Sequence, residues 1–172
     1  MQRGVLTLFG WLLFSGMACS SSSAPPHAAP DGGDAAGAAG YTGEVSCTSD
    51  PRVDTYTANL TRAGERGTLI FRLNSSDPVP PAKGPNTFVV SVLDGDGQAV
   101  SADLRIALLM PDHGHGTQVP ATVTYDESSG TYSIAPVYLF MAGVWRVELG
   151  LYSDTDQTKP VDTAVFFFCI EG

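Results

Sequence analysis

The chain has 172 residues, of which 43% are hydrophobic, and 18 acidic residues against nine Lys and Arg give a formal net charge of −9. This acidic balance excludes the electrostatic attraction on which nucleic-acid binding depends. The chain contains no Gly-x-Ser-x-Gly, P-loop or dinucleotide fingerprint, and its histidines have no positioned nucleophile beside them, so we do not expect an enzyme.

Residues 1–19 have the pattern of a bacterial lipoprotein signal peptide. The apolar run at residues 5–14 is too short to span a bilayer. Residues 16–19, with the sequence Gly-Met-Ala-Cys, resemble the cleavage box in which the cysteine becomes the lipidated N-terminus. We therefore expect lipid on Cys19 and a position on the periplasmic side of the cell envelope. Ser20 favours the outer membrane, and the alternative is an ordinary signal peptide cut before the cysteine.

Residues 20–43 consist mainly of Ser, Ala, Pro, Gly and Asp. A segment of this composition buries too little apolar surface to offset the entropy of ordering it, so we predict a disordered linker. The remaining residues, 44–172, are enough for one domain with its own core.

Two cysteines, Cys47 and Cys169, lie near the two ends of this domain. An even pair in an exported chain predicts a disulfide, which would join the first strand to the last. A metal site made of two thiols is the alternative.

Alternating apolar residues and regularly spaced turn residues predict an all-β domain. The expected strands are residues 56–60, 69–73, 87–93, 104–110, 122–125, 131–134, 145–151 and 164–169. The proline-rich residues 77–85 cannot continue a ladder, because proline lacks the amide donor, and we predict a loop between two sheets there. Seven or eight such strands favour an antiparallel immunoglobulin-like sandwich, with 145–151 as a central strand and Trp145 in the core.

Residues 110–116, Met-Pro-Asp-His-Gly-His-Gly, carry the clearest ligand chemistry and hold two of the three histidines. On extended backbone the imidazoles of His113 and His115 would lie on one side, since side chains alternate along a strand. Met110 adds a thioether, and Met141 is expected beside the same loop. Imidazoles and thioethers suit copper, particularly Cu(I). The alternative is a polar turn with solvated histidines and a core methionine.

The chain also resembles a known family. Residues 110–116 and 140–145 (Phe-Met-Ala-Gly-Val-Trp), together with 84–90 and 94–100, look like the YtkA-like domain, which is related to FixH-type proteins. Members of that family carry a Met-Pro-x-His-x-His-Gly loop followed by Phe-x-Met-x-Gly-x-Trp; here no residue separates the Phe from the Met. The resemblance implies a small exported β-sandwich whose relatives occur around copper handling and the assembly of respiratory oxidases.

Two functions therefore remain open. The first is a lipid-anchored periplasmic module that holds copper through Met110, His113, His115 and Met141 as a chaperone or buffer. The second is a metal-free structural or interaction domain of the cell envelope, in which the histidine loop contacts a partner protein or is simply a turn. The placement of Met141 relative to the two histidines discriminates between them.

Overall fold

The computed structural model describes residues 46–172, so the predicted signal peptide, Cys19 and the predicted linker lie outside the described residues. Within 46–172 there is no helix, and hence no helix that could cross a membrane. This part of the chain forms eight strands. They are β1 (Leu60–Ala63), β2 (Ile70–Asp77), β3 (Gly84–Leu93), β4 (Asp103–Leu109), β5 (Thr122–Asp126), β6 (Thr131–Leu139), β7 (Gly143–Ser153) and β8 (Asp156–Ile170).

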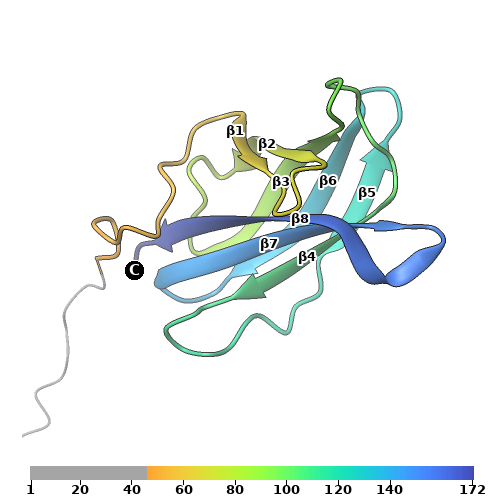
Figure 1. Ribbon diagram of the computed structural model, residues 1–172. Coiled ribbons are helices and arrows are strands. Elements are labelled where there is room, and N and C mark those ends of the chain that lie inside the picture. The colour runs from red at the N-terminus through yellow and green to blue at the C-terminus, as the bar shows by residue number, and fades with distance from the viewer. Residues whose placement is uncertain (1–45) are drawn as a thin grey trace, which may run out of the picture. The chain divides into compact units, whose positions relative to one another are not determined.

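The strands form two sheets, as Figure 1 shows. One sheet has the order β1-β2-β3-β6-β5 and the other the order β4-β7-β8, and every pairing of neighbouring strands is antiparallel. The chain passes from one sheet to the other after β3, after β4 and after β6. The predicted all-β sandwich is therefore confirmed, and so is the predicted hairpin, which joins β5 to β6.

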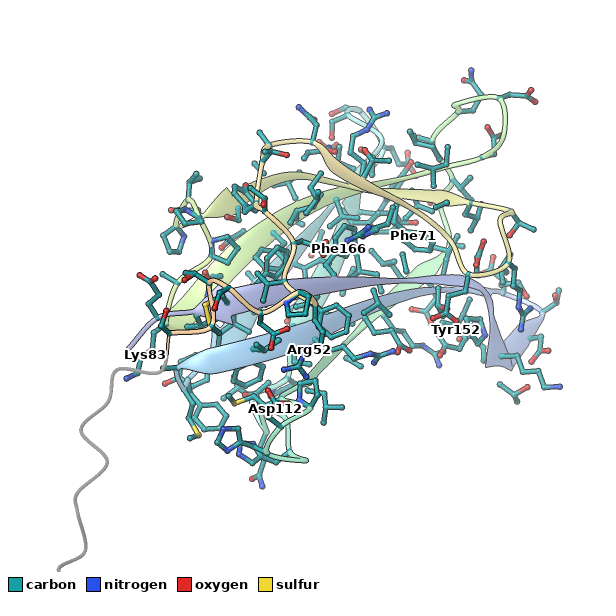
Figure 2. All side chains as sticks on the ribbon, turned by 60° about the vertical axis from the view of Figure 1, so that its left-hand side comes forward. Arg52, Phe71, Lys83, Asp112, Tyr152 and Phe166 are labelled. Carbon is teal, nitrogen blue, oxygen red and sulfur yellow. A yellow bond between two sulfur atoms is a disulfide. The ribbon has the colours of Figure 1, made fainter. Side chains whose placement is uncertain are left out.

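The core lies between the two sheets and follows from the alternation along the strands. Trp145, Val147, Leu149 and Leu151 on β7 are each at most 1% exposed, and β7 lies in the centre of its sheet, as predicted. On its other face Arg146 and Glu148 are half-buried and form an ion pair of 2.5 Å. Phe71 on β2, in the facing sheet, and Phe166 on the neighbouring strand β8 belong to the same core (Figure 2).

The first predicted strand is wrong in position. Residues 56–60 were expected to form a strand, but pairing with β2 begins only at Leu60. The backbone turns before it, because Asn59 has a φ of 63°, in the left-handed region that asparagine tolerates. Tyr56 still contributes to the core, with its hydroxyl accepting a hydrogen bond from the Ser76 amide at 2.8 Å.

The proline-rich segment is a loop, but it does not connect two sheets. It joins β2 to β3, which are neighbours in one sheet, with Asp77 opposite Thr87. The prolines correctly predicted where the hydrogen-bonded strand ends, because proline has no amide hydrogen to donate. That property does not determine which sheet the next strand joins. The buried side chain of Asn86 closes this loop by hydrogen bonds to both the amide and the carbonyl of Ala82, at 2.9 and 2.8 Å.

A buried carboxylate organises the turn between β1 and β2. Asp162, on β8, is 0% exposed and accepts hydrogen bonds of 2.9–3.0 Å from the amides of Arg66, Thr68 and Leu69. Gly64 is required beside it, because a Cβ at that position would overlap the carboxylate. Burial raises the pKa of Asp162, but these hydrogen bonds outweigh burial and lower the pKa to about 2.

Replacing Asp162 with asparagine is expected to lower the free energy of unfolding at pH 7 by roughly 2–3 kcal/mol, because buried amides lose a charged acceptor. The folded pKa lies below the unfolded value of about 3.9, so this stabilisation is present above pH ~4 and is lost as the pH falls towards ~2. Urea unfolding between pH 2 and pH 7 measures both effects. The exposed Asp154→Asn serves as the control. A neutral-pH difference below about 0.5 kcal/mol would contradict the assigned role.

Candidate functional site

The histidine loop is a tight turn at the end of β4. The amide of Met110 donates to the carbonyl of His115 at 2.7 Å, and the amides of His113 and Gly114 donate back to the carbonyl of Met110 at 3.1 and 2.9 Å. The argument that extended backbone would place both imidazoles on one side therefore does not apply to residues 113–115. Pro111 pre-sets the start of a turn, and Gly114, with a φ of 67°, completes it in the left-handed region.

The turn nevertheless brings the two imidazoles together. The ring centroids of His113 and His115 are 5.5 Å apart, with an angle of 59° between the planes, and both side chains are exposed. The ring of His115 stacks on that of Phe140, with centroids 5.8 Å apart and an angle of 23° between the planes. Phe140 in turn packs against Trp145 in a T-shaped arrangement, with ring centroids 5.5 Å apart. Residues 110–115 and the connection between β6 and β7 thus meet at one end of the sandwich.

The two methionines differ in accessibility. Met110 is 0% exposed and belongs to the hydrophobic core beneath the turn, with its methyl group next to Gly143. Met141 is half-buried and packs against the same core. In the sequence it directly follows Phe140, on which His115 stacks. Its carbonyl accepts a hydrogen bond of 2.9 Å from the Trp145 indole. The loop therefore carries two exposed imidazoles above one fully buried thioether, and the half-buried Met141 follows Phe140 in the neighbouring connection.

An arginine from a distant part of the chain holds this loop in place. Figure 2 shows Arg52 next to Asp112, and the guanidinium donates one hydrogen bond of 2.8 Å to each carboxylate oxygen. The same guanidinium also pairs with Asp50 at 2.6 Å. Hydrogen bonds from Arg52 lower the pKa of Asp50 to about 2 and also lower the pKa of Asp112. The same hydrogen bonds raise the pKa of Arg52.

Sequence reasoning missed Asp50 and Arg52 entirely. Arg52 and Asp112 are 60 residues apart, and neither lies in a strand or in a motif that would relate them. The only signal in the sequence was the predicted disulfide, which places the residues after Cys47 against the last strand. That disulfide is confirmed: Cys47 and Cys169 are bonded, with their Cα atoms 5.3 Å apart.

Residues 47–54, which we call the strap, are fixed to β8 at both ends. The first attachment is the disulfide. The second is Asp54, whose amide donates to the carbonyl of Phe167 at 2.8 Å and whose carboxylate accepts from the Phe167 amide at 2.9 Å. Arg62 also pairs with the Asp54 carboxylate. Arg52 therefore projects from a segment that is anchored on both sides.

A surface cavity of about 350 Å³ lies between the strap and the histidine loop. It is lined by Ser46, Cys47, Ser49, Asp50, Asp112, His113, Gly143 and Val144. Over residues 46–172, no cluster of three or more His, Cys, Asp or Glu side chains is placed to hold a metal ion. The candidate ligands remain those expected from the sequence, the two histidines and the two methionines.

A family model described as YtkA-like matches residues 65–150. The chain belongs to the YtkA-like family. The matched region of this YtkA-like protein includes Met110, His113, His115 and Met141, whereas the strap and both disulfide cysteines lie outside it. No curated protein and no solved structure matches the chain.

Proposed function

We propose that this YtkA-like protein is a lipid-anchored, copper-binding module of the bacterial cell envelope. It takes up one Cu(I) ion through His113 and His115, with Met110 and Met141 as soft partners. It holds the ion without chemical turnover and acts as a chaperone or buffer.

The separation of the two imidazole rings carries this proposal. A metal ion bonded to two imidazole nitrogens at ~2 Å, with each nitrogen ~1 Å from its ring centre, permits ring centres up to ~6 Å apart. The rings of His113 and His115 are 5.5 Å apart, within that limit, and both are accessible to solvent. This separation is compatible with both imidazoles binding one ion.

The surrounding side chains favour a soft ion. Met141 is half-buried and follows the Phe140 on which His115 stacks, so it is the more accessible of the two methionines. Met110 lies under the turn with no exposed surface and would have to shift towards the loop to act as a ligand. Thioethers favour Cu(I) over harder divalent ions.

Two observations support the cell-envelope location. The sequence at residues 16–19 resembles a lipoprotein cleavage box, with Cys19 as the lipidated residue. The Cys47–Cys169 disulfide is of the kind that persists in oxidising compartments such as the periplasm. Lipid on Cys19 would attach the domain to the membrane, and Ser20 favours the outer membrane.

A Cu(I) titration tests the proposed function. Every sample carries Cys19→Ser, so that no free thiol competes, and ascorbate keeps copper reduced without attacking the disulfide. Competition with a coloured Cu(I) chelator is expected to give one ion per chain. His113→Ala/His115→Ala should weaken binding by roughly 100-fold, or about 2.7 kcal/mol. His27→Ala, which removes the third histidine, is the matched control and should bind like the parent. Equal binding by the double variant, or no uptake by the parent, would refute the copper site.

One observation favours the second function. Met110 is 0% exposed and contributes to the core, while both histidines lie on an exposed turn, as a partner-contacting tip would place them. A metal-free interaction domain would bind an envelope protein through that turn. In that case the double histidine variant would lose the partner, and copper would have no effect on either form.

A further inference from the structure

We infer that Arg52 determines the metal selectivity of the histidine loop. By engaging both carboxylate oxygens of Asp112, it withholds the carboxylate that directly precedes His113 and leaves a soft set of imidazoles and thioethers. The inference rests on the proposed function only in taking the histidine loop as the metal-binding element.

The geometry of the ion pair is the first step. Nη1 of Arg52 donates to Oδ1 of Asp112 and Nη2 donates to Oδ2, each at 2.8 Å. In this bidentate arrangement both carboxylate oxygens of Asp112 accept a hydrogen bond from the guanidinium. Asp112 directly precedes His113, and both line the cavity beside the strap. The Asp112 side chain is 53% exposed, so burial does not keep its carboxylate from a metal ion. The ion pair with Arg52 is what would have to be displaced.

The strap keeps Arg52 in this position. Asp50 contacts the other edge of the guanidinium, with Nε 3.0 Å from Oδ1 and Nη2 2.6 Å from Oδ2. The Asp50 carboxylate also accepts the backbone amide of Arg52 at 2.8 Å. Because the disulfide at Cys47 and the backbone contacts of Asp54 fix the strap to β8, the guanidinium is positioned before any ion arrives. A metal ion that used Asp112 would have to displace it.

The donor chemistry gives the consequence. Two imidazoles with one carboxylate form a ligand set that Zn(II) commonly takes, whereas two imidazoles with thioethers suit Cu(I). Removing the guanidinium would free an oxygen donor and leave the charges of Asp50 and Asp112 unbalanced. Both changes favour a divalent ion over a monovalent one, because the Coulomb attraction scales with the charge of the ion. Arg52 thus disfavours Zn(II) at this loop.

The test compares Zn(II) and Cu(I) binding by the full chain with Arg52→Gln, again in the Cys19→Ser background. Since outer-shell partners tune metal affinity by roughly 10- to 100-fold, we expect Zn(II) to bind at least ~10-fold more tightly and Cu(I) to change by less than ~3-fold. Adding Asp112→Asn should return Zn(II) affinity to that of the parent. Arg105→Gln, which removes an exposed arginine paired with Asp103, is the matched control and should change neither affinity.

Unchanged Zn(II) affinity in Arg52→Gln, or a gain that survives Asp112→Asn, would overturn the inference. Arg52→Lys keeps the charge but not the two-pronged contact, and should show a smaller Zn(II) gain. It also provides a second folded variant should the glutamine variant unfold, which circular dichroism monitors. Failure of the parent to bind Cu(I), with a Zn(II) gain that needs Asp112 and His113, would refute the copper function and leave the role of Arg52 standing.

Discussion

Replacing Cys47 and Cys169 together with alanine is expected to lower the free energy of unfolding by up to about 5 kcal/mol. The two cysteines are 122 residues apart in sequence, so the disulfide closes almost the whole domain into one loop. In the chain-entropy account, a loop of this length restricts the unfolded chain strongly. A loss of this size approaches the total stability of many domains, so the variant should be close to unfolding at room temperature.

Chemical denaturation of the oxidised parent, the reduced parent and the double alanine variant measures this effect. The reduced parent and the variant should agree, because both lack the crosslink. A variant within about 1 kcal/mol of the oxidised parent would mean that the disulfide contributes little beyond the contacts of the strap. In that case the hydrogen bonds between Asp54 and Phe167, at 2.8 and 2.9 Å, would be the main attachment.

Trp145→Ala is expected to cost roughly 3–5 kcal/mol, the range typical of removing a large buried side chain. The indole is 0% exposed in the centre of the core, so its removal leaves a cavity that neighbouring strands cannot fill. The same change removes the hydrogen bond to the Met141 carbonyl and the contact with Phe140. Trp145→Ala should therefore also loosen the connection between β6 and β7, and with it the support of His115.

Unfolding of this variant is best followed by circular dichroism, since Trp145 is one of only two tryptophans and its removal takes away the fluorescent reporter. Trp145→Phe is the matched control: it keeps an aromatic ring but loses the indole donor, and should be less destabilising than alanine. A cost below about 1 kcal/mol for the alanine variant would be incompatible with a buried ring.

The fold could be predicted from the sequence because its determinants are local. Alternation along 145–151 identified the buried face of β7, and the turn residues between β5 and β6 located the hairpin. Pairing across the sheet depends on contacts between distant residues, and there the sequence was less informative. The proline-rich segment was placed between two sheets although it connects β2 and β3 within one, and the strand expected at 56–60 begins only at Leu60.

For the candidate site, the sequence identified side chains but not their arrangement. His113 and His115 are neighbours, as expected, but through a turn and not through extended backbone. The burial of Met110 depends on how β4 packs, which no local pattern reveals. The contact between Arg52 and Asp112 spans 60 residues, and it depends on the disulfide and the Asp54 hydrogen bonds that attach the strap to β8.

The disulfide also makes the domain a covalent ring between Cys47 and Cys169. The loop between β2 and β3 lies within that ring, and Val79 there is 70% exposed and open to a protease. A single cut at this loop would open the ring without releasing a piece, because the two fragments remain joined through sulfur. The strap and β8 would stay covalently attached, and with them the position of Arg52 beside the histidine loop. Separation of the fragments would then require a reductant as well as the protease.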